Sequence, residues 1–447
     1  MINQILKDYI NSRPNDIFIH YNNQDVTYDD MAYAIEGRVK SMQAINIQKG
    51  HIVGIYLGDS LNLIETLFGC IEIQALPLII PSSFTATEIK SLKEDIDFNC
   101  FITDWGKSKN INFNNVPTYS IEELSPGIGG CAPSIRNESN KNQIACMLLT
   151  SGTTGKPKIA EISINNIITS CESWNERISF KKDDVYLNCL PLHHIGGLSI
   201  IFRSLLYGFK IVLVNHFDAK DCISKIIQYK SNLVSLVPTM LSRLLKENKS
   251  TGIEKILRVI ILSGAYTSSS LLRSAIDRNM NIYKAYGMTE SSSGIFGFWV
   301  KDNLKHINSV GTPHNGVRFK IKDRNLLVKG PMVINRYYNT KNNDNWHNTY
   351  DRAHVSKDGF MYILGRDGQL ISGGENIDIK EVKDIISSHP NINDVFIETV
   401  KDEEWGDKLI AYINSQDLDE IQLKEWLKTL ISNYKIPKEF IFINNEN

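Results

Sequence analysis

The sequence predicts an α/β protein with a large N-terminal domain and a small C-terminal one, and three observations carry this prediction. Between residues 196 and 287, short segments rich in Val and Ile alternate with longer helical segments, which is typical of a parallel sheet with crossover helices. Residues 316–365 show short strands separated by turns, as in a small β-meander or barrel. After Gly365 a strand-like and a helical segment indicate a small α+β domain, which we expect to be mobile.

Nearer the N-terminus, residues 1–140 mix helical and strand-like patterns. Residues 51–57, HIVGIYL, predict a strand, and the spacing of the apolar side chains along residues 61–74 predicts one face of a helix. Residues 125–143 are rich in Gly, Pro, Ser and Asn, so we expect a loop there, ahead of the strand-like IACMLLT.

The alternating region also predicts where functional residues gather, because function in parallel sheets collects at the carboxyl ends of the strands. Two short segments, GAY at 264–266 and GMTE at 287–290, each follow a predicted strand. We therefore expect both at one edge of the sheet. The change of pattern later in the chain predicts a large domain over residues 1–366 and a small one over residues 367–447.

Composition narrows the class of protein. The 447 residues carry a formal net charge of −1, which argues against a general nucleic-acid binder. No apolar stretch is long enough to span a membrane and the first residues lack a secretory segment, so we expect no membrane insertion. The seven cysteines include no CxxC pair, which favours free thiols in a reducing cytoplasm over a structural zinc site.

Residues 148–158, LLTSGTTGKPK, combine hydroxyls, glycines and lysines after an apolar run. This is not a Walker A motif, because only two residues separate Gly152 from Gly155 and Pro157 follows Lys156. The stretch can still bind a phosphate chain, since glycines free backbone N–H groups and hydroxyls add donors. On composition alone, a polar surface turn remains an equal alternative.

The other motifs carry little information singly. YGMTE at 286–290 offers an aromatic face, a hydroxyl and a carboxylate, yet such a segment is more often a plain strand end. The adjacent histidines of PLHHIGG, at 191–197, form no metal motif and are more often structural. Asp351 and Arg366 alone would be solvated or paired side chains, and SGGEN at 372–376 would be a turn.

The order and spacing of these motifs change this interpretation. From about Thr27 to the C-terminus, the hydroxyl-rich loop, YGMTE, Asp351, GRDG and SGGEN follow one another as they do in the adenylate-forming superfamily, which the chain resembles. That superfamily contains acyl-CoA synthetases, nonribosomal-peptide adenylation domains and luciferases. Within it, residues 191–214 and 235–245 look most like the o-succinylbenzoate–CoA ligases of menaquinone and phylloquinone biosynthesis. The resemblance implies the adenylate-forming enzyme fold.

The resemblance also implies an ATP-dependent acid–thiol ligase that works in two half-reactions. A substrate carboxylate attacks the α-phosphorus of ATP, which releases pyrophosphate and leaves an acyl-adenylate. The thiol of coenzyme A then attacks the acyl carbonyl and releases AMP. Both halves move concentrated negative charge, so positioning and electrostatic stabilisation are expected to dominate catalysis. The implied cofactors are ATP, Mg²⁺ and coenzyme A, and the implied carboxylate is 2-succinylbenzoate.

The same resemblance implies roles for individual residues. Those expected to act in catalysis are His194, Thr289, Glu290 and Lys158, and Glu290 is also the expected Mg²⁺ ligand. Those expected to contact ATP or coenzyme A are Thr150, Ser151, Gly152, Thr153, Thr154, Gly155, Lys158, Gly264, Ala265, Tyr286, Gly287, Thr289, Asp351, Arg366, Gly373 and Gly374. Those expected to contact the acyl substrate are His194, Gly197, Arg203, Ser263 and Gly264.

Three of these residues have specific expected partners on the nucleotide. Tyr286 is expected to stack near adenine and Thr289 to contact the α-phosphate. Asp351 is expected to accept hydrogen bonds from both ribose hydroxyls, with Arg366 nearby.

Other expectations concern the second half-reaction. His194 is expected to shape or gate the reaction centre rather than to act as a general base. Gly373 and Gly374 are expected to line the pantetheine path after the small domain rotates about a hinge at Asp367–Gly368. The segment GRDGQLISGG is one residue shorter than the usual family spacing, so these positions are uncertain by one residue.

A substrate with a second carboxylate needs a cation to hold it. Arg203, on the predicted helix of the acyl pocket, is the candidate. An arginine that points outward into solvent is an equal alternative.

Several positions depart from the family pattern. Ile159 replaces a glycine, Ile164 replaces a histidine, and Tyr350 replaces the glycine of the usual Thr-Gly-Asp. Family chains continue past the segment YKIPK to a glycine-lysine that drives adenylation, whereas this sequence ends at YKIPKEFIFINNEN. Lys435 and Lys438 belong earlier in the family pattern, so we expect adenylation to be slower than thioester formation.

Two other functions remain open from the sequence. One is a stand-alone adenylation enzyme that loads a carrier protein, which would use the same first half-reaction. The other is a degenerate protein that binds a nucleotide or an acyl-adenylate without efficient turnover. The missing lysine favours this last function, while the phosphate loop, Glu290, Asp351 and SGGEN oppose it. A homodimer is also left open.

Overall fold

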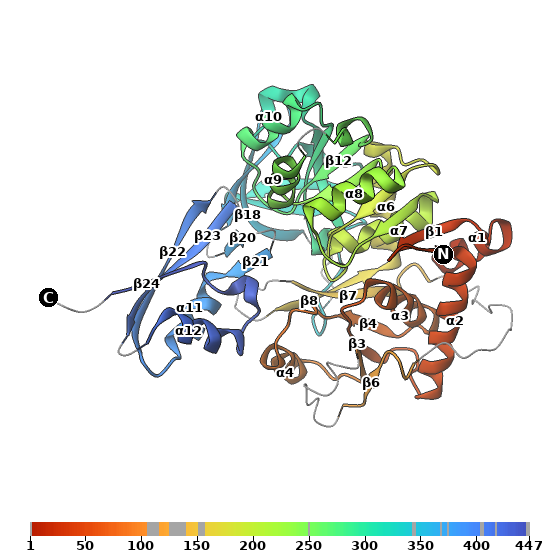
Figure 1. The fold of residues 1–447 in the computed structure, drawn as a ribbon, viewed down its shortest axis with the longest axis horizontal. Helices are drawn as coiled ribbons and strands as arrows, with labels where there is room; N and C mark the ends of the chain where they lie inside the picture. Colours follow the sequence, from red (N-terminus) through yellow and green to blue (C-terminus); the bar gives the residue numbers. More distant parts are fainter. Residues whose placement is uncertain are drawn as a thin grey trace.

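The structure is a computed structural model, and Figure 1 shows its fold. It describes residues 2–104, 116–124, 140–150, 157–248, 251–341, 346–366, 369–372, 375–402, 406–415 and 418–443. In this part of the chain the strands form four sheets, three in the N-terminal region and one in the C-terminal region. No helix in these ranges is long and apolar enough to cross a membrane.

The largest sheet has nine strands and contains the alternating region. Its central strands run parallel, and β12 is buried along its whole length because helices cover both faces of such a sheet. In spatial order the strands are β15 (Thr312–Pro313), β14 (Ser293–Trp299), β13 (Ile282–Met288), β12 (Val259–Leu262), β11 (Leu233–Leu236), β9 (Val185–Asn188), β10 (Lys210–Leu213), β1 (Ile17–Tyr21) and β2 (Gln24–Thr27).

A second sheet of six strands carries the hydroxyl-rich loop. In spatial order its strands are β6 (Thr118–Ser120), β5 (Cys100–Thr103), β3 (Ile52–Tyr56), β4 (Leu76–Ile79), β7 (Ile144–Thr150) and β8 (Lys158–Ser163). β7 and β8 are antiparallel, and Thr150 lies opposite Lys158. The predicted phosphate loop is therefore the connection between two paired strands.

Helices cover both large sheets (Figure 1). The α-helices of the N-terminal region are α1 (Ile2–Ser12), α2 (Tyr28–Ala44), α3 (Ser60–Ile73), α4 (Ala86–Asp95), α6 (Ile164–Ile178), α7 (Ile195–Tyr207), α8 (Ala219–Tyr229), α9 (Pro238–Glu247) and α10 (Ser269–Asp277). Short 3₁₀ helices are η1 (Ile253–Lys255), η2 (Thr289–Ser291), η3 (Lys301–His306) and, in the C-terminal region, η4 (Asn433–Lys435).

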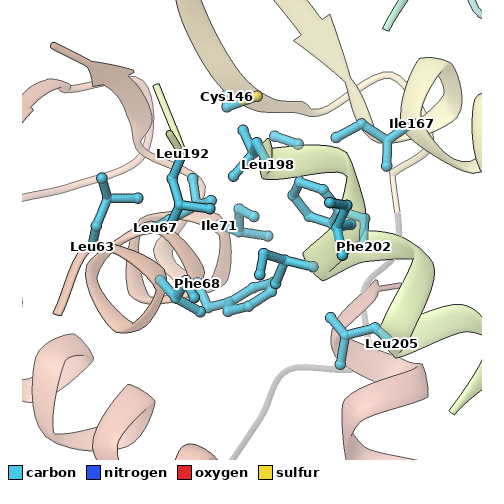
Figure 2. Packing of buried hydrophobic residues seen from close by; sticks show 14 of the residues in the cluster. Leu63, Leu67, Phe68, Ile71, Cys146, Ile167, Leu192, Leu198, Phe202 and Leu205 are labelled. Atoms are coloured by element: carbon cyan, nitrogen blue, oxygen red, sulfur yellow. The ribbon is translucent and has the colours of Figure 1, made fainter. Parts of the chain in front are cut away.

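Two of these helices join the sheets into one core. α3 packs on strands of the six-stranded sheet and α7 on strands of the nine-stranded sheet. Figure 2 shows Leu67 and Phe68 of α3 and Leu198 and Phe202 of α7 gathered in the space between the helices. The rings of Phe68 and Phe202 meet edge to face, with centroids 5.9 Å apart. This packing fixes α7, whose first turn belongs to the candidate site.

The third sheet is the predicted meander. Its strands β16 (Arg318–Lys322), β17 (Asn325–Lys329), β18 (His347–Val355) and β19 (Met361–Arg366) pair in chain order and are antiparallel. Short turns join β16 to β17 and β18 to β19, so the sequence pattern was enough to predict these two hairpins.

The C-terminal region has its own sheet and its own apolar core. The strands are β20 (Gln369–Ser372), β21 (Glu375–Asp378), β22 (Ile392–Asp402), β23 (Gly406–Ser415) and β24 (Glu439–Phe442), and the helices are α11 (Ile379–Ser387) and α12 (Glu420–Lys428). The chain leaves the meander at Arg366 and enters this sheet at Gln369.

The predicted fold class is confirmed, since the described residues form a large α/β region with a meander and a small α+β region. The strand predicted at 51–57 is β3 and the helix predicted at 61–74 is α3. The domain boundary at residue 366 and the hinge stay predictions, and Asp367–Gly368 lie outside the described residues. Most of the loop predicted at 125–143 also lies outside them.

A backbone prediction follows from Tyr350 in β18, which replaces a glycine of the family pattern. Its φ is +60°, a left-handed conformation that favours glycine, and its side chain is 46% exposed. We expect Tyr350→Gly to be more stable than Tyr350→Ala by about 1 kcal/mol, because glycine has no steric penalty at this φ. Urea unfolding measures the difference.

Val355 in the same strand provides the control, since its φ is not positive. There the alanine variant should be the more stable of the two. The same order of stability at both positions would contradict the strain assigned to Tyr350.

Candidate active site

Motifs that are far apart in the sequence are carried by strands of four sheets and by the start of α7. β13 leads into the segment that holds Thr289 and Glu290, and β7 and β8 bring in Thr150 and Lys158. The remaining contributions are Asp351 from β18, His194 from the N-cap of α7 and Glu375 from β21.

On the phosphate side, a tyrosine links the predicted loop to the predicted metal ligand. Lys158 Nζ lies 5.3 Å from the centroid of the Tyr337 ring. The Tyr337 hydroxyl donates a hydrogen bond to Glu290 Oε1 at 2.8 Å. Lys158 and Glu290 therefore lie on either side of one side chain. Ser151, Gly152, Thr153, Thr154 and Gly155 lie outside the described residues.

Glu290 fits a magnesium ion by its chemistry. Mg²⁺ prefers carboxylate and phosphate oxygens and keeps several waters, so one protein carboxylate together with the phosphates of a nucleotide is a suitable ligand set. The side chain of Glu290 is partly exposed, which leaves it accessible to such an ion. Its role as metal ligand stays a prediction.

On the nucleoside side, two predicted residues contact each other. The Tyr286 hydroxyl donates a hydrogen bond to Asp351 Oδ2. Asp351 is 8% exposed, and its backbone N–H donates to the Thr349 hydroxyl at 3.1 Å. Arg366 lies opposite Asp351 in the β18–β19 ladder. The structure thus brings together the predicted adenine and ribose contacts.

Three predicted glycines have distinct backbone settings. Gly264, directly after the Ser263 that follows β12, has a φ of +88°. A Cβ on Gly287 would lie 2.1 Å from the Ser293 carbonyl oxygen, and a Cβ on Gly197 would lie 2.5 Å from two carbonyl oxygens of residues 190–191. Packing is therefore sufficient to require glycine at 197 and 287, and contacts of these residues with ligands stay predictions. Gly373 and Gly374 lie outside the described residues.

An ion pair joins the two regions across the site. His194 Nε2 lies 2.9 Å from Glu375 Oε1, and both side chains are partly exposed. Burial opposes charge on each group, but the pairing prevails: it raises the pKa of His194 and lowers the pKa of Glu375 to about 2. Burial, together with the charge of His194, lowers the pKa of the neighbouring His193 to about 3, so His193 is neutral near pH 7.

The sign of these shifts gives the pH range of the pair. Because the pKa of His194 is raised, the stability that this residue adds to the folded arrangement is complete below its ordinary pKa of 6.5. That stability is lost as the pH rises through the raised pKa. Because the pKa of Glu375 is lowered, the stability that this residue adds is complete above its ordinary pKa of 4.5. That stability is lost as the pH falls through about 2. The pair therefore supports this arrangement best between about pH 4.5 and 6.5.

Arg203 lies on α7, nine positions after His194, and is 2% exposed. Its guanidinium carbon lies 4.4 Å from the centroid of the Trp174 ring, and Nη2 donates to the Ser293 hydroxyl at 2.8 Å. The alternative that this arginine points into solvent is wrong, because α6 and β14 enclose it.

Sequence analysis missed three residues that the structure places at or near the site. Tyr337 lies in a loop with no family motif, and only its proximity to β8 reveals its role. Glu375 is part of SGGEN, but its pairing with His194 spans 181 positions. Lys435 was considered only as a substitute for the missing lysine, although it is a buried member of an interdomain contact.

A titration tests the ion pair. In Glu375→Gln the pKa of His194 should fall below its wild-type value, because the carboxylate charge is lost while much of the burial remains. NMR titration of isotope-labelled histidine measures it, with a His194 variant to assign the signal. Glu398→Gln is the control, since Glu398 instead bonds Tyr412 at an exposed position. An unchanged pKa in Glu375→Gln would contradict the pairing.

The closely similar proteins include the 2-succinylbenzoate–CoA ligase of Bacillus cereus, which is 26% identical over 96% of this chain and 92% of its own length. Among solved structures, the o-succinylbenzoate CoA synthetase of Bacillus subtilis, as a double mutant bound with its product analogue, is 26% identical and has a TM-score of 0.91. It covers 98% of this chain and 94% of its own.

Two other structures of the Bacillus subtilis enzyme superpose less well. The complex with the acyl-adenylate intermediate has a TM-score of 0.78 at 27% identity and covers 98% of this chain and 94% of its own. The complex with ATP and magnesium ion has a TM-score of 0.77 at 27% identity and covers 98% of this chain and 95% of its own.

These matches confirm the superfamily that the motifs predicted, and the chain is an acyl-adenylate-forming acid–thiol ligase. The predicted cofactors ATP, Mg²⁺ and coenzyme A are confirmed at the level of the family. The roles of single residues are not tested by the matches and stay predictions.

Family models divide the chain in two. The model of AMP-binding enzymes matches residues 6–338, and the model of the AMP-binding enzyme C-terminal domain matches residues 381–446. Together with the hydrogen bond that joins Tyr286 and Asp351, these matches establish that the chain belongs to the AMP-binding enzyme family.

Proposed function

We propose that this enzyme activates 2-succinylbenzoate as an acyl-adenylate and transfers it to coenzyme A, as a step in menaquinone or phylloquinone biosynthesis. The observation that carries this choice of substrate is Arg203, a buried cation with no carboxylate partner among the described residues. The names of the relatives support the same substrate class.

Arg203 is unusual because its charge is only partly compensated. Its Nε has no hydrogen-bond partner in the described part of the chain, and the groups that do accept from it, the hydroxyls of Ser293 and Tyr186, are neutral. Burial lowers the pKa of the guanidinium, but arginine stays protonated in proteins. A buried, incompletely paired cation is costly, and an anion close by would offset that cost.

The position of Arg203 makes a substrate carboxylate a suitable anion. α7 begins at His194, beside the reaction centre, and Arg203 lies further along the same helix. Its partner Ser293 directly follows the segment that holds Thr289 and Glu290. A substrate with carboxylates at both ends could therefore place one at the α-phosphate of ATP and the other toward Arg203.

Residues of the large domain would serve the first half-reaction. Asp351 and Tyr286 would hold the nucleoside, and Lys158 would neutralise charge on the phosphate chain. Glu290 would hold Mg²⁺, which when bound offsets the negative charge of the phosphates. The attacking carboxylate oxygen forms a bond to the α-phosphorus, and the bond to pyrophosphate breaks.

In the second half-reaction, His194 would position groups rather than accept a proton. The thiol gives up its proton to solvent, its sulfur forms a bond to the acyl carbon, the acyl–oxygen bond breaks, and AMP leaves with that oxygen. Glu375 raises the pKa of His194, which favours the protonated imidazole, and a protonated imidazole is no base. Its charge would instead stabilise negative charge that develops nearby.

A comparison of two acids tests this proposal. 2-Succinylbenzoate should yield pyrophosphate, AMP and a coenzyme A thioester, whereas 4-oxo-4-phenylbutanoate, which lacks only the ring carboxylate, should react far more slowly. In Arg203→Leu we expect kcat/KM for the dicarboxylate to fall roughly thirtyfold or more, because the ring carboxylate loses its cation. This factor corresponds to a loss of about 2 kcal/mol of transition-state stabilisation. The value for the monocarboxylate should change little.

Arg203→Lys is the matched control, since it keeps the charge and should retain much of the preference for the dicarboxylate. Equal losses for both acids in Arg203→Leu would show that the arginine only supports the packing around Trp174. Thioester formation from other acids but not from 2-succinylbenzoate would overturn the proposed substrate.

A further inference from the structure

A second contact between the two regions lies away from the nucleotide residues. Lys435, in η4 of the C-terminal region, places Nζ 2.9 Å from Glu88 Oε1 and 2.8 Å from Glu381 Oε1. Glu88 belongs to α4 of the large region, whereas Glu381 belongs to α11 of the same region as Lys435. Lys435 is 8% exposed, so this pairing is largely shielded from water.

Neutral hydrogen bonds surround the charged group. The Ser432 hydroxyl lies 2.8 Å from Glu88 Oε2 and 3.2 Å from the Ser83 carbonyl oxygen. The Thr85 and Thr87 hydroxyls donate to the carbonyl oxygens of Leu430 and Thr429, at 3.3 and 3.0 Å. We call residues 83–88 and 429–435 together the α4 contact.

The α4 contact can open while each charged group keeps a polar partner. When the regions separate, Lys435 keeps Glu381, which moves with it. Glu88 keeps its place in the capping box of α4, where Oε2 accepts from the Thr85 backbone N–H at 2.9 Å. Since stranding a buried charge is the main cost of breaking an ion pair, retention of a partner on each side makes separation reversible.

The charges in the contact favour the closed arrangement. Burial would lower the pKa of Lys435, but Glu88 and Glu381 together raise it, so the lysine is charged near neutral pH. Asp378 also faces Glu381, and the pKa of Glu381 is raised by burial despite its bond to Lys435. Among the ion pairs of the described residues, Glu88 supplies the carboxylate that bonds Lys435 from across the boundary.

The α4 contact occurs together with the His194–Glu375 pair at the active site. The charge of Lys435 contributes to the lowered pKa of Glu375, which places the two groups near each other. The whole chain superposes with a TM-score of 0.91 on the relative bound with its product analogue, and of 0.77 on the same relative with ATP and magnesium ion. Both cover 98% of this chain, so the two differ in how their parts are arranged.

We propose that Glu88 and Lys435 are positioning residues that hold the small domain in the arrangement for thioester formation, and that the α4 contact opens for adenylation. This inference rests on the proposed two-step function. It assigns to the first turn of α4 a task in the second half-reaction, although α4 supplies none of the predicted site residues.

The variant Glu88→Gln distinguishes the role of Glu88 in bonding Lys435 from its role in capping α4. Glutamine keeps the capping box but removes the charge that reaches Lys435. We expect thioester formation from supplied acyl-adenylate and coenzyme A to slow by roughly tenfold, the usual size of coupling between two states. Pyrophosphate release from acid and ATP should not slow. Glu94→Gln, at an exposed position of the same helix, is the control and should change neither rate.

A double-mutant cycle identifies the partner. Lys435→Met should slow thioester formation at least as much as Glu88→Gln does, and the double variant should be little slower than Lys435→Met alone. Additive effects of the two substitutions would show that Glu88 and Lys435 act independently and would overturn the proposal.

A distance measurement keeps the test independent of the substrate. Spin labels on cysteines introduced at Glu94 in α4 and Glu425 in α12, both exposed, report the separation of the two regions by electron paramagnetic resonance. Cys131 lies outside the described residues and is replaced by serine, and the other six cysteines are buried. Glu88→Gln should shift the population toward longer or more varied distances. Glu88→Gln is introduced into the same protein that carries both labels, so the label positions are identical in the two samples.

The outcomes separate the two proposals. A slower second half-reaction with an altered distance supports the α4 contact. Wild-type rates and distances in Glu88→Gln overturn it. If the unmodified chain forms no adenylate from 2-succinylbenzoate while Glu88→Gln still changes the distance, the proposed substrate fails and the contact stands.

Discussion

The rest of this structure depends on ion pairs that join two regions without fixing them together permanently. If the small region rearranges between adenylation and thioester formation, as we propose, the contacts between the regions form and break in each cycle. The His194–Glu375 pair satisfies this at the reaction centre, where both side chains stay partly exposed. In the proposed α4 contact, Lys435 would do the same, because it would keep Glu381 on leaving Glu88.

The sequence was sufficient to predict those strands and helices that depend on local residue patterns. The strands and helices between residues 196 and 287 and the meander were recognisable because periodicity and turns are local properties. Motif order placed Tyr286 and Asp351 on one ligand, and the structure joins them by a hydrogen bond. The pairs His194–Glu375 and Glu88–Lys435 span 181 and 347 positions, and no periodicity reports such contacts. They depend on how two separately folded regions meet.

Two buried cations of the large domain, Lys284 and Arg203, differ in how the cost of their burial can be reduced. Lys284 of β13 is buried and donates to the Ile307 carbonyl oxygen at 3.0 Å, and burial lowers its pKa to about 8. A lysine can thus reduce the cost of burial by releasing its proton. Arg203 cannot, and its Nε has no partner among the described residues. We therefore propose an anionic ligand as a further partner of this permanent charge, beside its contacts with Trp174 and Ser293.

The central claim is that a carboxylate becomes an acyl-adenylate before it reaches coenzyme A. Transfer of a heavy oxygen isotope tests this most directly: 2-succinylbenzoate with labelled carboxylates is supplied with ATP and coenzyme A, and the AMP is analysed by mass spectrometry. The attacking oxygen stays on phosphorus when the thiol displaces AMP, so the account predicts one labelled oxygen in each AMP. Unlabelled AMP, or the release of ADP and phosphate in its place, would contradict it.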